Sequence, residues 1–117
     1  MKTGPEADGL YLDRIVELVV LIRDALAGVG EADFLSDRTL GDATALRLGA
    51  IGELSRKLST DVKTRQGAVP WVRMYRLRNI VAHHYDRLDY RIIWEVATTA
   101  LEEILIACRA ELERFDG

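Results

Sequence analysis

The chain has 117 residues, a length typical of one domain, and carries a formal net charge of −3. Its composition, 49% apolar and 30% charged residues with only two prolines, argues against intrinsic disorder, and no apolar run is long enough for a membrane span. The single cysteine, Cys108, excludes an internal disulfide and a cysteine-based zinc site. Residues 1–5 are followed by acidic residues rather than by the apolar stretch of a secretory signal, so we expect a cytoplasmic protein. We expect one domain over residues 1–117, with residues 1–9 flexible.

The spacing of apolar residues is helical along nearly the whole chain, without the alternation that is typical of strands. A first helix is predicted to end at Gly28 and Gly30, which suit a helix stop. Its apolar residues recur at steps of three and four: Leu12, Ile15, Val19, Ile22 and Leu26. A second helix is predicted from an N-cap at Ser36 or Asp37 to about Ser59. Its expected buried face comprises Leu40, Ala43, Leu46, Ala50, Leu54 and Leu58.

Two more helices are predicted after the polar stretch 60–67. Pro70 fits the first turn of a third helix, which starts near Trp71 and has a core stripe of apolar residues. That stripe is Met74, Leu77 and Val81. Asp89 is the predicted N-cap of a fourth helix, whose inward residues are Ile93, Ala97, Leu101, Ile104, Cys108 and Leu112. Four helices joined by short or moderate loops predict an all-α fold, an antiparallel four-helix bundle.

Two helix surfaces are unusual, and each has two interpretations. Gly49 and Gly52 in the second helix either let another helix approach closely or are tolerated at the surface, and we favour close packing. One face of the third helix carries Trp71, Tyr75, Arg78, Ala82 and Tyr85, at intervals of three and four. This face is either a protein interface, where aromatic residues and arginine are enriched, or a set of ordinary core aromatics beside a surface arginine.

Charge is unevenly distributed along the chain. Residues 56–91 hold nine basic and three acidic residues, a charge of +6, so the remainder carries −9. The nine are Arg56, Lys57, Lys63, Arg65, Arg73, Arg76, Arg78, Arg87 and Arg91. This asymmetry predicts either a basic surface for a polyanion or arginines that pair with acidic residues of the other helices.

The two histidines, His83 and His84, follow Arg78 by five and six residues. On an ideal helix Arg78 and His83 are about 140° apart around the axis and roughly 7.5 Å apart along it, so they cannot both point into one narrow pocket of a single helix. Either the helix frays after Ala82, or the two residues flank a cleft that another chain completes. Asn79 lies one turn before His83, within reach of a hydrogen bond.

Arg78, His83 and Tyr85 form an Arg-x4-His-x-Tyr motif that resembles the signature of HEPN-fold proteins, specifically the HepT toxins of the HepT/MntA toxin–antitoxin family, of type II or type VII. The resemblance covers residues 43–115, while residues 1–35 match only as a helix and a loop. The flanking residues that agree with it are Ile51, Gly52, Glu53, Pro70, Trp71, Leu77, Asn79 and Trp94.

The resemblance implies a homodimer of HEPN-type helical bundles, with the motifs of both chains meeting in one cleft. It implies metal-independent endoribonuclease activity through Arg78 and His83, without a cofactor, on RNA and in particular transfer RNA. It also implies a nucleotidyltransferase antitoxin, similar to MntA, that neutralises the toxin by transferring AMP to Tyr85. These residue types suit that chemistry, because histidine exchanges protons near neutral pH and arginine grips phosphate oxygens bidentately. The phenol hydroxyl of tyrosine is an acceptor that can be nucleotidylated.

Two further residues are expected to support the site. His84 is a second candidate base or a surface residue, although the four-residue spacing favours His83. Glu53 borders the apolar stripe of its helix and needs a partner, for which an arginine of the third helix is the candidate. We expect Glu53 to have a positioning or structural role rather than a catalytic one.

Two other functions stay open at the level of the sequence. One is a non-catalytic helical partner subunit of a minimal nucleotidyltransferase, and the other is a helical homodimer whose motif is only a polar contact. The Arg78–His83 pair favours the enzyme, because a scaffold does not need it. The sequence has no nucleotide-binding glycine loop or acidic metal cluster, so we expect no metal site and no AMP transfer by this chain itself.

Overall fold

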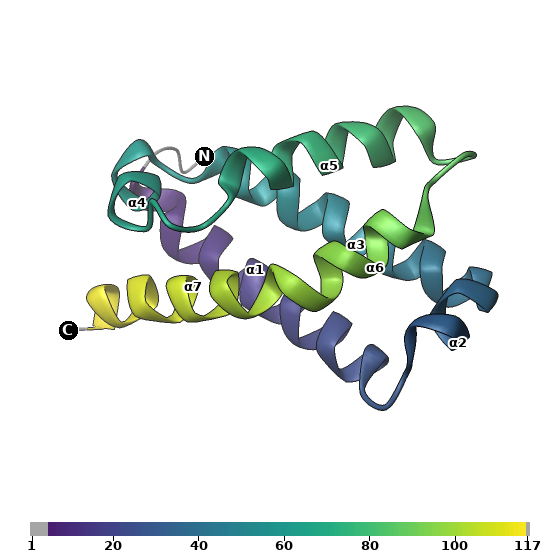
Figure 1. The fold of residues 1–117 in the computed structure, drawn as a ribbon. Helices are drawn as coiled ribbons and strands as arrows, with labels where there is room; N and C mark the ends of the chain where they lie inside the picture. The colour runs from purple at the N-terminus through teal and green to yellow at the C-terminus, as the bar shows by residue number, and fades with distance from the viewer. Residues whose placement is uncertain (1–4, 117) are drawn as a thin grey trace.

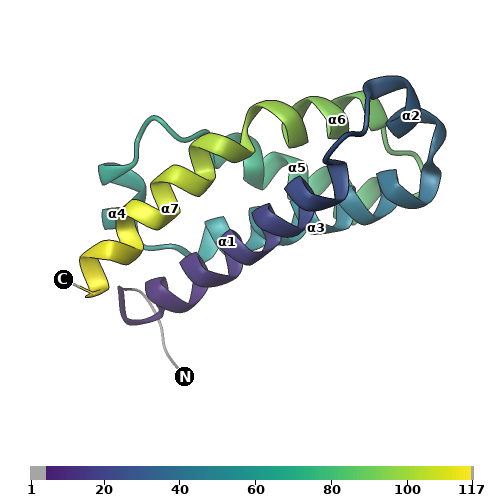
Figure 2. The ribbon, with the colours of Figure 1, turned by 90° about the horizontal axis from the view of Figure 1, so that it is seen from below.

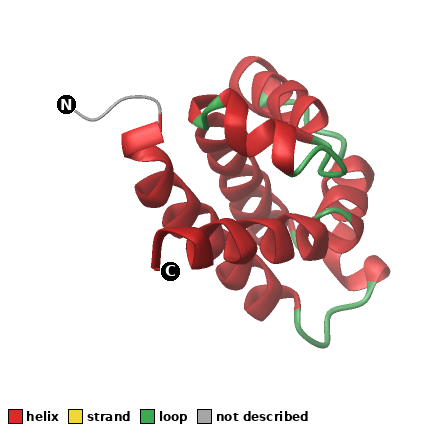
Figure 3. Cartoon of the chain, turned by 90° about the vertical axis from the view of Figure 1, so that its left-hand side faces the viewer, coloured by secondary structure: helices red, strands yellow, loops and turns green. Residues whose placement is uncertain are grey.

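The computed structural model describes residues 5–116, which form helices joined by loops, without a strand among them (Figures 1 and 3). The all-α expectation is therefore confirmed, but the described chain has seven helices instead of four. They are α1 (Pro5–Leu26), α2 (Glu31–Ser36), α3 (Arg38–Lys57), α4 (Thr60–Arg65), α5 (Trp71–His84), α6 (Tyr90–Thr99) and α7 (Leu101–Asp116).

Helix α3 is the centre of the arrangement. It packs along α5 on one side and against α1 on another, and α7 lies against α1 (Figures 1 and 2). Short α2 and the start of α6 meet at one end of the molecule, whereas α4, the start of α1 and the end of α7 meet at the other (Figure 1). One apolar core runs between these helices and draws on nearly all of them.

Several helix ends follow from local side-chain chemistry. Asp37 is the N-cap of α3 and accepts a hydrogen bond from the amide of Leu40, and Asp89 caps α6 by accepting from the amide of Arg91. Gly28 has a φ of +76°, a left-handed conformation that suits glycine, just beyond the end of α1. These three predictions, together with the start of α5 at Trp71, are confirmed.

The predicted fourth helix is interrupted at Ala100, where α6 ends and α7 begins. The hydroxyl of Thr98 donates to the carbonyl of Trp94, and the hydroxyl of Thr99 donates to the carbonyl of Glu95. Such back-bonding competes with the helical ladder and bends helices. The two neighbouring threonines therefore account for a break that apolar spacing did not predict, although the predicted buried residues of this segment do face the core.

Two short helices were also not predicted. Helix α2 carries Phe34, which is buried and packs on Trp94 of α6 with ring centroids 5.1 Å apart. Helix α4 lies in the stretch expected to be a polar loop, and its Val62 is fully buried. Each of these helices buries one apolar side chain. A single buried residue gives no periodic pattern in the sequence, so neither helix could be predicted from apolar spacing.

The predicted buried face of α3 is confirmed only in part, since Leu58 is buried and Leu40 and Leu54 pack partly buried against the core. Leu46, which we expected to be buried, is 71% exposed, and the residues of α3 that are buried are mostly small. They are Gly41, Thr44, Ala45, Leu48, Gly49, Ile51, Gly52 and Ser55. Small side chains let the neighbouring helices approach, so the packed face combines these small residues with the fully buried Leu48 and Ile51.

The N-terminal segment differs from the expectation as well. Residues 1–4 lie outside the described residues, but the chain is helical from Pro5 on, and Ala7 and Asp8 are buried. Asp8 is held in place because its carboxylate accepts hydrogen bonds from both the amide (2.9 Å) and the hydroxyl (2.6 Å) of Ser59.

Candidate active site

Helix α5 carries most of the predicted site residues and is anchored by its apolar side. Met74 and Leu77 are buried in the core, and Val81 is partly buried against it. Arg78 and Asn79 follow on the more accessible surface of the helix. The helix continues without fraying through His84, so the alternative that it unwinds after Ala82 is excluded.

Two glycines of α3 bring α5 unusually close at this point. A Cβ atom on Gly52 would lie 2.7 Å from the Cβ of Arg78 and closer still to the backbone carbonyl oxygen of Met74. A Cβ on Gly49 would meet Val81 at 3.4 Å. The preferred interpretation of these glycines, close helix packing, is confirmed. As a result the backbone of α5 at Arg78 packs directly against the backbone of α3 at Gly52.

Glu53, the neighbour of Gly52, pairs with the motif arginine across this contact. Its Oε2 lies 3.1 Å from Nε of Arg78, so the predicted partner of Glu53 is confirmed. The same carboxylate accepts hydrogen bonds from Arg56, at 2.7 Å from Nη2 and 3.4 Å from Nε. The hydrogen bond from Arg56 lowers the pKa of Glu53 below its ordinary value, and the charge of Arg78 adds to the effect. One ionised carboxylate thus holds two guanidinium groups beside each other.

Asn79 has a different partner from the one expected. Its Oδ1 accepts a hydrogen bond from Nη1 of Arg78 at 3.1 Å, and no hydrogen bond joins Asn79 to His83. The reason is geometric, because the long arginine side chain bends back to its chain neighbour while its Nε is engaged by Glu53. Asn79 and Glu53 therefore hold the Arg78 guanidinium from two sides.

His83, His84 and Tyr85 lie at the exposed C-terminal end of α5. All three side chains are exposed, and Tyr85 is 73% accessible. Within one chain the structure brings Tyr85, Arg78 and Glu53 to a single shallow groove of about 380 Å³ between α3 and α5. The other lining residues are Leu46, Gly49, Ala50, Val81 and Ala82. Neither histidine lines this groove, so the structure does not bring His83 and Arg78 together within one chain.

The aromatic and arginine face of α5 divides into two halves. Trp71 is buried and donates a hydrogen bond from its ring nitrogen to the carbonyl of Gln66. Tyr75 packs against the core and donates to the carbonyl of Ser55 at 3.2 Å. These two residues are core aromatics, whereas Ala82 and Tyr85 in the second half are exposed. Only the C-terminal half of the face is available to a partner.

Two basic residues beside this site escaped the sequence analysis as members of it. Arg56 shares the carboxylate of Glu53, and Lys63 of α4 donates to the hydroxyl of Tyr75 and to the carbonyl of Arg56. The spacing of Arg56 three residues after Glu53 was a usable signal, since residues at i and i+3 are neighbours on a helix. No such signal existed for Lys63, because α4 was not predicted.

Groups that would hold a metal ion are not found in the described part of the chain: it contains no cluster of three or more His, Cys, Asp or Glu side chains with suitable geometry. Within the same residues no helix is long and apolar enough to cross a membrane.

The fold and the motif define an all-helical HEPN-like domain with an arginine and two histidines exposed on one helix. The chain matches the family described as ribonuclease HepT-like over residues 15–111, and it belongs to that family.

Curated relatives agree with this assignment. The chain is 33% identical over 85 residues to "Probable ribonuclease HepT" of Thermococcus cleftensis, covering 73% of this chain and 77% of that protein. It is 32% identical over 94 residues to "Putative RNase TTE0752" of Caldanaerobacter subterraneus subsp. tengcongensis, covering 80% and 81% of the two chains. No solved structure is significantly similar to the chain.

Proposed function

We propose that the protein is the toxin of a toxin–antitoxin pair, an endoribonuclease that cleaves RNA without a metal ion through Arg78 and His83. The observation that carries this proposal is that the guanidinium of Arg78 is both held in place and accessible, in a chain of the HepT-like ribonuclease family. Its guanidinium is held by Glu53 and Asn79 while the side chain remains 40% exposed, so it is preorganised and still accessible to a phosphate. Preorganised charge at the reacting group is the main way in which enzymes stabilise a charged transition state.

The reaction needs a base for the 2′-hydroxyl proton, a cation for the phosphate and an acid for the leaving oxygen. Arg78 provides the cation, because a guanidinium can grip two phosphate oxygens at once. Histidine is the residue type best suited to act as general base or acid, and we assign both roles to His83. Two copies of the site in one cleft would let one His83 act as the base and its counterpart as the acid.

A homodimer is part of the proposal. Because α5 is continuous to His84, Arg78 and His83 point about 140° apart on one chain, and a second copy of the helix is needed to bring a histidine opposite an arginine. Leu46 and Tyr85 are both more than two-thirds exposed and line the same groove as Arg78. Large exposed apolar side chains beside a site are typical of surfaces covered by a partner.

Neutralisation is proposed to occur at Tyr85, by transfer of AMP from a nucleotidyltransferase antitoxin similar to MntA. The hydroxyl makes no hydrogen bond within the described residues, and the side chain is 73% exposed. An AMP group there would add a negative phosphate and a base in the groove that also contains Arg78, which would repel RNA and block its path.

The deciding experiment is incubation of the purified protein with total tRNA in the presence of EDTA. Wild-type protein should cleave it, while Arg78→Ala and His83→Ala should not, although both should remain folded dimers by light scattering and circular dichroism. Arg73→Ala serves as the matched control and should retain activity, because Arg73 pairs with Glu95 and does not line the groove. Cleavage by either of the first two variants would refute the assigned roles.

A separate experiment tests the modification. Mass spectrometry after mixing with an MntA-like enzyme and ATP should show one AMP adduct, absent in Tyr85→Phe. If the wild-type dimer cleaves no RNA but binds the nucleotidyltransferase, the alternative function as a non-catalytic partner subunit would replace the enzyme.

A further inference from the structure

A chain of polar contacts leads from Arg78 away from the histidines toward α4. Arg78 contacts Glu53, and Glu53 accepts from Arg56. The carbonyl of Arg56 in turn accepts from Nζ of Lys63 at 3.3 Å, and the same ammonium donates to the hydroxyl of Tyr75 at 2.5 Å. Three cationic side chains, Arg56 of α3, Lys63 of α4 and Arg78 of α5, are therefore connected across these helices. We call the surface that these three residues form the seam.

The negative charge along this seam is much smaller than the positive charge. Arg56 and Arg78 share the single carboxylate of Glu53. Lys63 has only neutral oxygen partners, and no carboxylate of the described residues lies within ion-pair distance of its ammonium. An ammonium has three donors, of which two are used, so one remains for a further acceptor. The seam thus carries a net charge of about +2 when the motif arginine is included.

Two other basic residues of the segment 56–91 pair with acidic residues of other helices. Arg65 pairs with Glu111 of α7 at 2.6 Å, and Arg73 pairs with Glu95 of α6 at 3.3 Å. The sequence left two interpretations of these basic residues open, a basic surface for a polyanion or pairing with acidic residues of other helices. The structure contains residues of both kinds. Arg65 and Arg73 follow the second interpretation, whereas Arg56 and Arg78 share one carboxylate. Lys63, like Lys57, Arg76 and Arg91, has no ion-pair partner within the described residues, and of these four it is Lys63 that contacts the carbonyl of Arg56.

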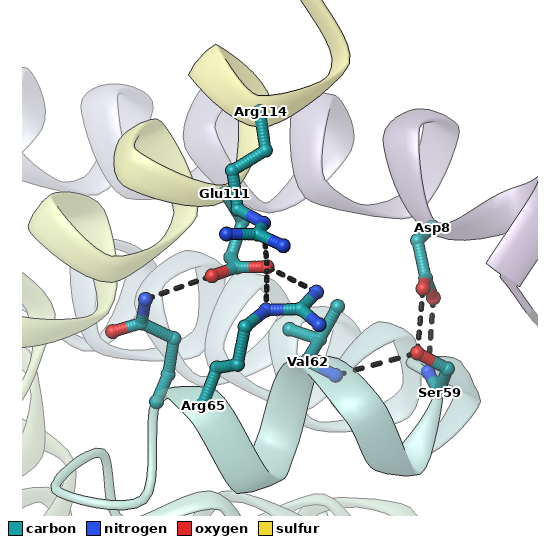
Figure 4. Close-up of polar contacts among 7 residues, drawn as sticks. Asp8, Ser59, Val62, Arg65, Glu111 and Arg114 are labelled. Atoms are coloured by element: carbon teal, nitrogen blue, oxygen red, sulfur yellow. Dashed lines mark hydrogen bonds and ion pairs between the residues drawn. The ribbon is translucent and has the colours of Figure 1, made fainter.

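Helix α4 is fixed at both ends, which fixes Lys63. At its start, Ser59 is bound by the buried carboxylate of Asp8 of α1, and at its end Arg65 and Gln66 donate to Glu111, whose side chain is 2% exposed (Figure 4). A six-residue helix is too short to be stable alone, so these contacts and the buried Val62 determine its position. The ammonium of Lys63 is consequently preorganised on the seam.

We propose that Arg56 and Lys63 form a second phosphate-binding site, which holds the RNA backbone on the α4 side of Arg78. This inference rests on the proposed function and deepens it, because it gives the direction in which the RNA leaves the reacting phosphate. A strand bound at Arg78 presents further phosphates at every nucleotide, and cations along one line are what such a backbone requires. Phosphate contacts of this kind fix the register of the strand without reading its sequence.

A purely structural role for the same residues makes a different prediction. Lys63 caps a carbonyl in the last turn of α3, and Arg56 lies in that turn, where cations are favourable. If that were all, their replacement would lower the thermal stability and leave RNA affinity unchanged.

The test measures binding of 3′-labelled unfractionated tRNA by fluorescence anisotropy, in a His83→Ala background that leaves the RNA intact. Arg56→Gln and Lys63→Met should each weaken binding about threefold to tenfold at low ionic strength and reduce the salt-dependence slope by about 0.7 to 0.9. Lys63→Arg should restore affinity, because it keeps the charge. Arg73→Gln is the matched control, since it also removes an arginine paired with a glutamate, and should change neither quantity.

Unchanged affinity and slope in Arg56→Gln and Lys63→Met would overturn the inference, as would an equal loss in Arg73→Gln. Arg56 is 62% exposed on its side chain, so Arg56→Gln should fold even if Lys63→Met does not. Failure of the proposed function gives another result, because wild-type protein would then leave tRNA uncleaved. If wild-type protein cleaves tRNA and Arg56→Gln leaves its KM unchanged, only the second phosphate site is wrong.

Discussion

Glu53 and Arg78 form an ion pair across the contact of α3 and α5, with Oε2 and Nε 3.1 Å apart. The pair exists because Gly52, the neighbour of Glu53, allows the backbone of α5 to approach α3 at Arg78. Since the carboxylate engages Nε, the outer nitrogens of the guanidinium keep donors available for a phosphate. Glu53 is thus a positioning residue for the proposed reaction, and it acts through Arg78.

Replacing Glu53 by glutamine should lower kcat for tRNA cleavage about tenfold, because a guanidinium that is free to move loses orientation in the transition state. KM should stay the same or fall, since a negative charge beside the bound phosphates is removed. The midpoint of thermal unfolding should change little, because exposed ion pairs contribute less than about 1 kcal/mol.

Glu95→Gln provides the control for Glu53→Gln, as it breaks the Arg73 pair on another side of α5 and should leave kcat unaltered. A kcat of Glu53→Gln equal to that of the wild type would show that Arg78 needs no such support.

The close packing of α3 on α5 gives a stability prediction. Gly52→Ala should destabilise the protein by about 1–3 kcal/mol, because the new methyl group meets backbone and Cβ atoms that cannot move aside. Gly9→Ala in α1 has nothing within 4 Å of the added carbon and should stabilise by up to about 1 kcal/mol through helix propensity. Urea denaturation of both variants measures the difference, and a Gly52→Ala protein as stable as the wild type would contradict the packing.

Features set by neighbouring residues were predictable from the sequence. Asp37 and Asp89 cap helices through amides two or three residues away, and the pair of Glu53 with a basic residue of the third helix followed from its place beside an apolar stripe. For the buried face of α3 the close packing at Gly49 and Gly52 was predicted, but the burial of Leu46 was predicted wrongly. Apolar spacing favoured the face with Leu46, whereas packing selected the face with Gly49 and Gly52, because backbone approach needs small residues rather than hydrophobic ones.

Features set by distant residues were missed. Helix α4 depends on Glu111, which contacts Arg65 from 46 positions along the chain, and no local pattern shows that contact. The break at Ala100 arises from hydroxyl groups of Thr98 and Thr99, whose effect depends on rotamers. The part of the candidate site that lies on α4 was therefore hidden, while the motif on α5 was recognisable.

Acid should weaken the anchoring of α4. Burial raises the pKa of Glu111, but hydrogen bonds from Arg65 and Gln66 outweigh burial, and the pKa lies below its ordinary value. A carboxyl group with a lowered folded-state pKa stabilises the protein above its unfolded pKa, and this stabilisation is lost as the pH falls through the folded pKa. The free energy of unfolding should therefore decrease from about pH 5 downward.

Glu111→Gln tests this linkage. It should cost about 1–3 kcal/mol at neutral pH and should make the acid side of the stability profile flatter than in the wild type. Glu113→Gln, an exposed neighbour on α7, should leave both unchanged. Parallel wild-type and Glu111→Gln profiles below about pH 5 would show that this carboxylate does not carry the acid dependence.

The lone cysteine should be chemically silent in the native protein. Cys108 is fully buried in the core between α7 and its neighbours, and burial raises its pKa to about 12. Because the thiolate is the reactive form, labelling by a disulfide reagent at about pH 8 should occur only through unfolding. The labelling rate should consequently rise in Gly52→Ala by about tenfold for each 1.4 kcal/mol of stability lost, and fast labelling of the folded wild type would contradict the burial of this thiol.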